Sequence, residues 1–258
     1  MNLITSRDNP LMKELRRLSQ DSTAYRKSGR VWLEGDHLCR AALDRGVQPE
    51  LAVFAESLWP SAPMAWTQAA NKNVVLPDTL FSEISSLESP AKMGFVLQAP
   101  VQMQVQAQTA TVVLDRVQDA GNVGSILRSA SAFGFKQVLA IKGTAALWSP
   151  KVLRAGMGAH FGLHLMEGLS YEALNDLAVP MVATSSHQGP FLHQLLSQGE
   201  LPMPCAWLMG HEGQGVAPHL ADQAQLAVRI AQPGGEESLN VAAAAAICLH
   251  ASATCVLG

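Results

Sequence analysis

The chain has 258 residues, of which 48% are hydrophobic and 15% charged, so it can bury a sizeable core and is not disordered as a whole. Its formal net charge of −3 excludes the strongly basic overall field that is typical of many nucleic-acid-binding proteins. Four cysteines without a C-x-x-C pair, a polar N-terminus and the absence of an apolar run of about 20 residues predict a reduced, cytoplasmic protein with no signal peptide and no membrane span.

The first 40 residues are basic although the whole chain is acidic. They contain eight basic and five acidic residues, whereas the remainder contains ten basic and sixteen acidic ones. Residues 10–19 place apolar side chains at helical spacing and Lys13, Arg16 and Arg17 between them. This pattern predicts an amphipathic helix with one basic face, which either is simply solvated or contacts RNA.

The N-terminal third alternates short strands and helices. Strands are predicted at 30–34, 51–54, 73–76 and 94–97, and helices at 35–44 and 79–85. Residues 99–109 are uncharged and have no helix start, which is typical of a linker. We therefore predict a small α/β domain over residues 1–98, a linker over 99–109 and a second domain over 110–258.

The second domain also alternates, which predicts an α/β fold with a mostly parallel sheet covered on both faces. Strands are expected at 111–114, 137–141, 162–165, 181–184, 206–209 and 226–230. Helices are expected at 122–133, from Ser149-Pro150 onward, at 171–177 and from about Ser238 to the alanine-rich end.

One motif spans residues 115–130, where a strand leads into a helix, the usual location of function in a parallel α/β sheet. Asn122 can cap this helix, and Arg128 follows about one and a half turns later. Taken alone, the two residues could be no more than a helix cap and a surface charge.

Two glycine-rich stretches follow later strands. Residues 207–215 read Trp-Leu-Met-Gly-His-Glu-Gly-Gln-Gly, and residues 234–241 read Gly-Gly-Glu-Glu-Ser-Leu-Asn-Val. Glycine lets backbone N–H and C=O groups approach a small ligand closely. Each stretch is weak evidence alone, since Glu212 could be a solvated loop residue and Ser238 and Asn240 the cap of the last helix.

The three motifs in this order resemble the SpoU (TrmH-type) branch of the SPOUT RNA methyltransferases. The resemblance covers residues 109–258 and extends to 4–13 and 31–35, which look like the small substrate-binding domain that many members carry. It implies a C-terminal trefoil knot that binds S-adenosylmethionine, a homodimer formed through the knotted domain, and methyl transfer to a ribose 2′-hydroxyl in rRNA or tRNA.

The resemblance also assigns roles to individual residues. The expected cofactor-binding positions are Leu208, Met209, Gly210, Ile230 and Leu239, where apolar side chains suit an adenine ring and backbone groups read its polar edge. The expected catalytic positions are Arg128, Asn122, Glu212, Ser238 and Asn240, and the expected RNA-binding ones are Arg154, Lys151, Lys13, Arg16 and Arg17. Because an arginine is effectively never deprotonated, Arg128 is expected to clamp a phosphate and stabilise a developing alkoxide rather than act as a base.

Three alternatives compete with this interpretation. A knotted protein could bind RNA without catalysis, and a knotted enzyme could methylate a base nitrogen. A Rossmann-type oxidoreductase is disfavoured because the glycine spacing after the strand at 111–114 does not match G-x-G-x-x-G. A metal site is also disfavoured, because the only histidine pair at i, i+4 spacing, His160 and His164, straddles a predicted strand start.

Overall fold

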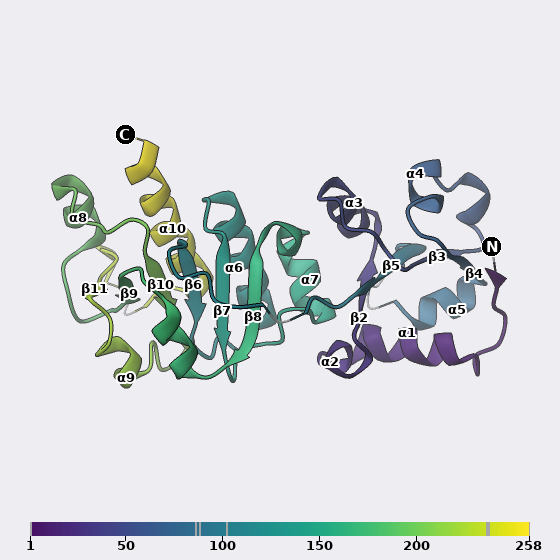
Figure 1. Ribbon diagram of the computed structural model, residues 1–258, viewed down its shortest axis with the longest axis horizontal. Coiled ribbons are helices and arrows are strands. Elements are labelled where there is room, and N and C mark those ends of the chain that lie inside the picture. The colour runs from purple at the N-terminus through teal and green to yellow at the C-terminus, as the bar shows by residue number, and fades with distance from the viewer. Residues whose placement is uncertain (1, 86, 88, 102, 236–237, 258) are drawn as a thin grey trace. The chain divides into compact units, whose positions relative to one another are not determined.

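The computed structural model describes residues 2–85, 87, 89–101, 103–235 and 238–257. It divides into two compact units, unit 1 with residues 1–101 and 148–161 and unit 2 with residues 102–147 and 162–258 (Figure 1). Residue 102 of the expected linker lies outside the described residues. The sequence assigned 148–161 to the second domain, but α7 (Pro150–Gly156) packs in unit 1 against α1 (Pro10–Gln20) and β2 (Arg30–Glu34).

Unit 1 contains a five-stranded mixed sheet in the order β1-β4-β3-β5-β2. β5 runs antiparallel to β2 and β3, whereas the β1-β4 and β3-β4 pairs are parallel. The remaining strands are β1 (Asn2–Leu3), β3 (Leu51–Ala55), β4 (Asn73–Leu76) and β5 (Met93–Gln98), and the helices are α2 (Ala24–Ser28), α3 (Asp36–Asp44), η1 (Trp59–Ser61), α4 (Met64–Thr67) and α5 (Asp78–Glu83). The alternating pattern of the sequence therefore predicted this unit correctly as a small α/β fold.

Unit 2 contains a six-stranded sheet in the order β11-β9-β10-β6-β7-β8, and every neighbouring pair is parallel. The strands are β6 (Thr111–Leu114), β7 (Gln137–Ile141), β8 (His164–Leu169), β9 (Met181–Thr184), β10 (Ala206–Met209) and β11 (Leu226–Val228). Because most of these strands are apolar along their whole length, they read as continuous runs, which is typical of a sheet buried on both faces. The predicted parallel sheet is confirmed.

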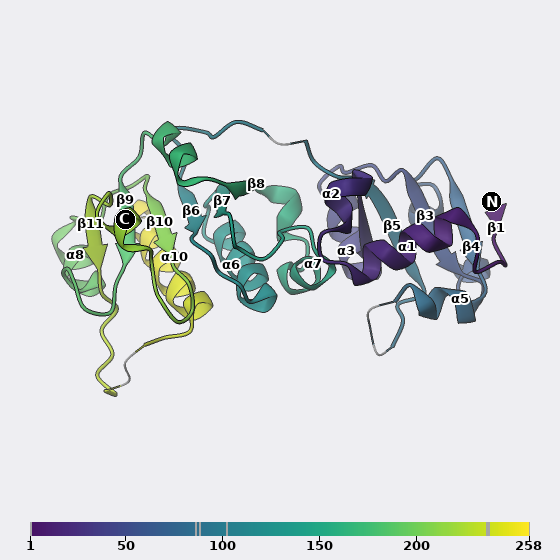
Figure 2. The same ribbon diagram turned by 90° about the horizontal axis from the view of Figure 1, so that it is seen from below.

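Helices cover both faces of this sheet. α6 (Ala120–Ala132), α8 (Leu192–Gln198) and α10 (Val241–Leu257) lie on one face, and the 3-10 helix η3 (Tyr171–Asp176) and α9 (Pro218–Ala221) lie on the other (Figure 2). Neighbouring residues of β10 point to opposite faces. The Trp207 indole donates to the Ser252 hydroxyl of α10 at 2.9 Å, whereas Leu208 packs in the core beneath η3 and α9.

Several element bounds differ from the sequence predictions. The segment predicted as a helix at 171–177 is the 3-10 helix η3, because it is too short to accumulate stabilising i→i−4 hydrogen bonds. The strand predicted at 162–165 begins only at His164, since η2 (Ala159–Gly162) occupies its start. The last helix begins at Val241 rather than near Ser238, and β11 ends at Val228.

Candidate active site

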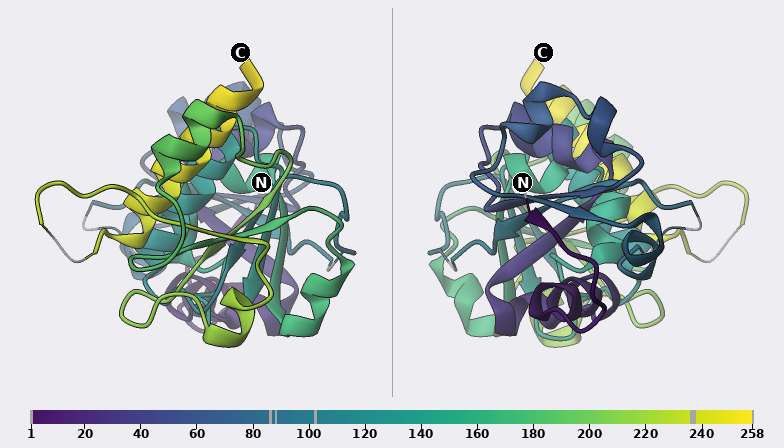
Figure 3. Two further views of the ribbon diagram at one scale, coloured as in Figure 1. Left: turned by 90° about the vertical axis from the view of Figure 1, so that its left-hand side faces the viewer. Right: turned by 90° about the vertical axis from the view of Figure 1, so that its right-hand side faces the viewer.

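Four parallel strands of unit 2 end at one edge of the sheet, where β11, β9, β10 and β6 follow one another. The chain leaves them through residues 115–119 after β6, 185–191 after β9, 210–217 after β10 and, among the described residues, 229–235 and 238–240 after β11. Figure 3 shows the described residues that follow β11 leading away from the body of the unit. The carboxyl edge of a parallel sheet is where ligands bind in open α/β folds, so these four segments define the candidate site.

Asn122 lies at the centre of a hydrogen-bond network that joins three of these segments. Its side-chain amide donates to Glu212 Oε1 at 3.2 Å, and its side-chain oxygen accepts from Asn240 Nδ2 at 3.0 Å. Glu212 also accepts from the backbone N–H groups of Gln118 at 3.2 Å and Asp119 at 3.1 Å. Three predicted site residues from three separate motifs are therefore in direct contact.

The helix caps explain why the Asn122 side chain is available for this network. α6 begins at Ala120, and its N-cap is Asp119, whose carboxylate accepts from the Asn122 backbone N–H at 2.7 Å. The expectation that Asn122 caps the helix is therefore wrong, because the helix starts two residues earlier and an aspartate satisfies its first turn. Asn240 does cap α10, since its Oδ1 accepts from the N–H groups of Ala242 at 2.9 Å and Ala243 at 3.2 Å.

Glu212 is a hydrogen-bond acceptor held in its ionised form. Partial burial would raise the pKa of its carboxyl group, but the Asp119 and Gln118 N–H groups and the Asn122 amide lower that pKa below its ordinary value. The carboxylate also lies at the N-terminus of α6, where the helix dipole favours a negative charge. Glu212 therefore ties the loop after β10 to the start of α6 and is a weak proton acceptor at neutral pH.

Arg128 and Ser238 take no part in this network. Arg128 is exposed on α6, and no hydrogen bond or ion pair of its guanidinium is recorded among the described residues. Ser238 is exposed in the stretch after β11 and, within the part of the chain that the structure describes, has no recorded side-chain hydrogen bond. The predicted catalytic set thus divides into a connected trio, Asn122, Glu212 and Asn240, and two exposed residues.

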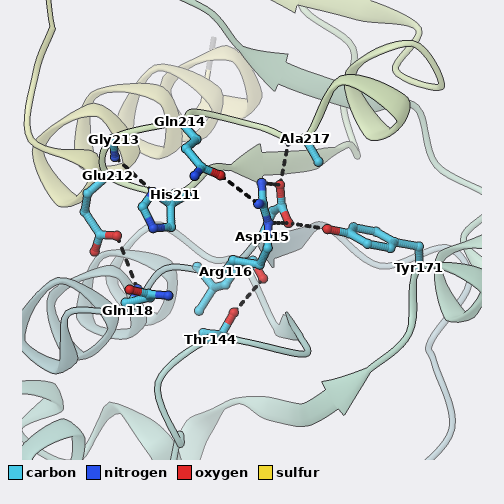
Figure 4. Close-up of polar contacts among 11 residues, drawn as sticks. Asp115, Arg116, Gln118, Thr144, Tyr171, His211, Glu212, Gly213, Gln214 and Ala217 are labelled. Carbon is cyan, nitrogen blue, oxygen red and sulfur yellow. Dashed lines mark hydrogen bonds and ion pairs between the residues drawn. The ribbon is translucent and has the colours of Figure 1, made fainter.

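A second polar cluster, centred on the fully buried Asp115, lies beside this network (Figure 4). Asp115 Oδ1 accepts from Arg116 Nε at 2.9 Å and Tyr171 Oη at 2.8 Å, and Oδ2 accepts from Arg116 Nη2 at 3.2 Å and the Ala217 N–H at 2.7 Å. Arg116 Nη1 also donates to Gln214 Oε1 at 3.0 Å. The cluster holds the middle and the C-terminal end of the loop 211–217. Sequence reasoning missed it although Asp115 and Arg116 stand inside a quoted motif.

The cofactor positions expected at the end of β10 can offer backbone groups to a ligand, but not the apolar side chains that the sequence suggested. The side chains of Leu208 and Met209 are fully buried in the sheet packing, so they do not cover an adenine ring, and only their backbone can face a ligand. Gly210 is needed for a close backbone approach, because a Cβ there would lie 2.1 Å from the backbone of Gly215 and Val216. Leu239 is 38% exposed and, unlike Leu208 and Met209, has a side chain that a ligand can reach.

The segments after β9 and β11 are joined by Arg229, a contact that sequence reasoning also missed. Its Nε donates to the Gly189 carbonyl at 2.8 Å, and its guanidinium lies over the Phe191 ring, 4.1 Å from the centroid. Ile230 follows and is half-buried. Next to it, the buried Gln232 Oε1 has no hydrogen-bond partner among the described residues, so this loop offers an acceptor for a donor from a ligand.

The basic residues expected to bind RNA all lie in unit 1. Lys13 pairs with Asp8 at 3.3 Å, Arg16 pairs with Glu83 at 2.6 Å, and Arg17 is exposed. Lys151 and Arg154 are exposed on α7. Part of the basic face of α1 is thus already neutralised by acidic partners, which leaves Arg17 as its most accessible charge.

The described residues contain neither a candidate metal site nor a candidate membrane span. No group of three or more histidine, cysteine, aspartate or glutamate side chains is placed to hold a metal ion there. Over the same residues, no helix combines the length and the apolar character that crossing a membrane requires.

Comparison with known proteins agrees with the geometry of the site. The sequence profile of the SpoU rRNA Methylase family matches residues 109–250, and that of the MRM3-like substrate binding domain matches residues 9–94. The chain is 30% identical over 254 residues to the 23S rRNA (guanosine(2553)-2′-O)-methyltransferase RlmP of Bacillus subtilis, covering 97% of this chain and 98% of that protein.

Solved structures give the same answer. An AdoMet-bound rRNA methyltransferase from Sinorhizobium meliloti is similar with a TM-score of 0.84 at 26% identity, covering 100% of this chain and 99% of the other. The SpoU methyltransferase AviRb from Streptomyces viridochromogenes shares the fold, with a TM-score of 0.86 at 20% identity over 97% and 99% of the two chains. The family match spans more than half of the sequence and contains all three motifs, and the chain therefore belongs to the SpoU rRNA methylase family.

Proposed function

We propose that this protein transfers a methyl group from S-adenosylmethionine to a ribose 2′-hydroxyl in rRNA. The observation that carries the proposal is the Asn122–Glu212–Asn240 network, which assembles three motifs at the carboxyl edge of the sheet. A relative similar over nearly the full length of this chain is named as an rRNA 2′-O-methyltransferase. We extend that activity to this chain and leave the individual nucleotide open.

The loops at the carboxyl edge fit S-adenosylmethionine, which supplies an electrophilic methyl group. The backbone of Leu208, Met209 and Gly210 would bind it, together with Ile230 and Leu239 from the stretch after β11. The fit rests on the reachable side chain of Leu239 and the orphaned acceptor of Gln232, while Gly210 lets the loop after β10 close against the backbone of Gly215. Arg229 contributes by holding the loop after β9 against the one after β11.

Methyl transfer would break the S–CH₃ bond of the sulfonium and form an O–CH₃ bond to the ribose, with S-adenosylhomocysteine as the leaving group. The 2′-hydroxyl must lose its proton as the new bond forms, and at this exposed site the proton would pass to solvent water. The ionised Glu212 is occupied by three donors and has a lowered pKa, so it positions Asn122 instead of accepting this proton. Arg128 has a guanidinium with no recorded partner among the described residues, and it can bind the adjacent phosphate and stabilise negative charge on the oxygen. Ser238, which is exposed in the stretch after β11, would supply a hydroxyl donor to the same ribose.

We further propose that unit 2 is knotted and forms a homodimer. An apolar groove of about 640 Å³ runs along α8 and α10, lined by Leu192, Leu196, Ile230, Ile247 and Ala251 among others, and Ile247 is 41% exposed. A second copy of the chain would cover this surface, which explains why α10 is apolar almost all round. Size measurement in solution with an Ile247→Glu variant tests the dimer, because a charge in the groove should yield monomers.

RNA is the proposed partner, with Arg17, Lys151 and Arg154 as accessible phosphate contacts and Lys13 and Arg16 at the edges of that surface. The four cysteines form no disulfide, and three of them are buried. Reduced thiols suit a reducing compartment, so we propose that the protein acts in the cytoplasm.

The test is methyl transfer to rRNA transcribed in vitro, with the product mapped by its resistance to alkaline cleavage at 2′-O-methylated positions. Arg128→Ala should lower kcat/KM by about 100-fold, since removal of one preorganised charge-stabilising group costs that much. Lys136→Ala, an exposed cation at the opposite edge of the sheet, is the matched control and should retain full activity. Methylation that leaves the RNA alkali-sensitive would indicate a base nitrogen as the acceptor, and RNA binding without any methyl transfer would indicate a protein that acts by binding alone.

A further inference from the structure

Unit 1 contains a cavity that is separate from the cofactor loops. It has a volume of about 170 Å³ and is bounded by β2, the start of α3 and α7. A cavity of about 150 Å³ accommodates one benzene ring. The cavity in unit 1 is therefore large enough for one flat aromatic ring, and apolar groups such as Leu38 and Leu153 supply flat contact surface.

One polar group of the cavity wall is a hydrogen-bond donor, the indole N–H of Trp32, that has no acceptor among the described residues. Trp32 lines the cavity and is only 3% exposed. Leaving a buried donor unpaired costs about 1–3 kcal/mol, so such a group is expected to meet an acceptor in a functional complex. Trp32 thus marks the cavity as a binding site rather than a packing defect.

Acceptors lie in the same wall. Glu34 follows Trp32 by two residues on β2 and so shares its face of the sheet, and Asp36 begins α3. The Glu34 carboxylate accepts from the Ser85 hydroxyl, and a carboxylate has about four acceptor sites in all. A ligand for this wall must offer both an acceptor to the indole and an N–H donor to a carboxylate.

We propose that this cavity receives one unstacked base of the RNA substrate, whose edge offers a carbonyl or ring-nitrogen acceptor to the indole and an N–H group to a carboxylate. Proteins read single-stranded RNA by inserting splayed bases into such pockets and bonding their edges, and a carboxylate is the usual partner of an exocyclic amino group. Unit 1 matches a substrate-binding domain, which favours a base of the RNA over a free metabolite. The inference rests on the proposed function and deepens it by naming a base-reading site.

NMR of the indole N–H groups tests the site directly on the whole protein. The chain has five tryptophans, and the signal lost in Trp32→Phe assigns Trp32. Titration of the wild type with GMP, CMP, AMP, UMP and ribose 5-phosphate should shift the Trp32 signal with at least one of the four nucleotides and not with ribose 5-phosphate. The proposal is overturned by no shift with any nucleotide, or by an equal shift with ribose 5-phosphate.

A filled cavity provides the second arm of the test. Ala91 lines the cavity, so Ala91→Phe should abolish the Trp32 shift and raise KM for RNA about tenfold with kcat nearly unchanged, since losing one base contact is worth about 1–3 kcal/mol. Ala69→Phe, at a half-buried alanine of unit 1 outside the cavity, is the matched control, and Glu34→Gln repeats the test without adding bulk. If Ala91→Phe and Glu34→Gln both keep the wild-type KM, the proposal is wrong.

Different results would contradict the proposed function and the base site. A wild-type protein that binds no S-adenosylmethionine in a calorimetric titration and methylates no RNA would contradict the proposed function. A protein that does both, but whose Trp32 signal does not change with any of the four nucleotides, would contradict the base site alone.

Discussion

Replacing Asp115 by asparagine should destabilise unit 2 strongly although the two side chains have the same shape. Each Asp115 oxygen accepts two hydrogen bonds, Oδ1 from Arg116 Nε and Tyr171 Oη, and Oδ2 from Arg116 Nη2 and the Ala217 N–H. Whichever way an asparagine amide is turned, its NH₂ group faces two donors. Two hydrogen bonds to a charged group are lost, each worth roughly 1.5–3 kcal/mol before the partial exposure of Arg116 is discounted.

We therefore expect Asp115→Asn to lower the free energy of unfolding by about 3 kcal/mol, within the range for breaking a buried ion pair. For a chain of this size that loss corresponds to a fall in Tm of about 6–12 °C. Urea and thermal unfolding measure both quantities. Asp222→Asn, at an exposed aspartate, should change nothing, and Tyr171→Phe should cost only about 1 kcal/mol. A loss below about 1 kcal/mol in Asp115→Asn would refute the reasoning.

The same carboxylate predicts a pH dependence of known sign. Burial would raise the pKa of Asp115, but the bonds from Arg116, Ala217 and Tyr171 outweigh it and lower that pKa below its ordinary value. A group with a lowered folded-state pKa stabilises the fold above its unfolded pKa of about 4, and this contribution is lost as the pH falls through the folded value. The wild type should therefore lose stability more steeply below pH 4 than Asp115→Asn does, and parallel acid limbs would contradict the assignment.

Three further outcomes are expected. Glu212→Gln should lower kcat/KM about tenfold in the methylation assay, because a charge-assisted hydrogen bond to Asn122 worth about 1.5 kcal/mol is replaced by a neutral one. An unchanged rate would show that the carboxylate is not needed for positioning. Gly210→Ala should abolish S-adenosylmethionine binding in calorimetry, since its Cβ would lie 2.1 Å from the Gly215 backbone, and retained affinity would exclude this loop from the cofactor site. Iodoacetamide at pH 8 should alkylate the exposed Cys255 before the buried Cys248, because burial raises the pKa of Cys248 to about 12. Mass spectrometry identifies the labelled residue, and rapid labelling of Cys248 would contradict its burial.

The sequence predicted the strands best because they are short apolar runs between glycines, prolines and charged residues. β4 and β7 occur with the expected bounds, and β9 and β10 do as well. Short helices were harder, since an element of one or two turns depends on the packing around it rather than on its own propensity. α8 is an instructive omission, because Leu192, Leu195 and Leu196 have the i, i+3, i+4 spacing of an amphipathic helix, although Gly199 and Pro190 confine it to two turns.

The candidate site was predictable as a location but not as a set of contacts. Each motif follows a parallel strand, so the sequence alone places Asn122, Glu212 and Asn240 at one edge of the sheet. It does not place Tyr171 against Asp115, 56 residues away, because that bond depends on where η3 crosses the sheet. Nor does it decide between Asp119 and Asn122 as the cap of α6, since both side chains can accept from a first-turn N–H group.

The geometry separates residues that build the site from residues that are able to act in it. Asn122, Glu212 and Asn240 bond to one another and to the N–H groups that start α6 and α10, so their polar groups are largely committed to fastening loops. A carboxylate with three donors and a lowered pKa is poorly suited to take a proton from a ribose hydroxyl. In the proposed mechanism, stabilisation of the developing charge therefore has to come from a cation outside this network, and Arg128 is an exposed candidate within the described part of unit 2. Such a mechanism depends on preorganised charge and position, which explains why most polar side chains of the site form hydrogen bonds that hold its loops in place.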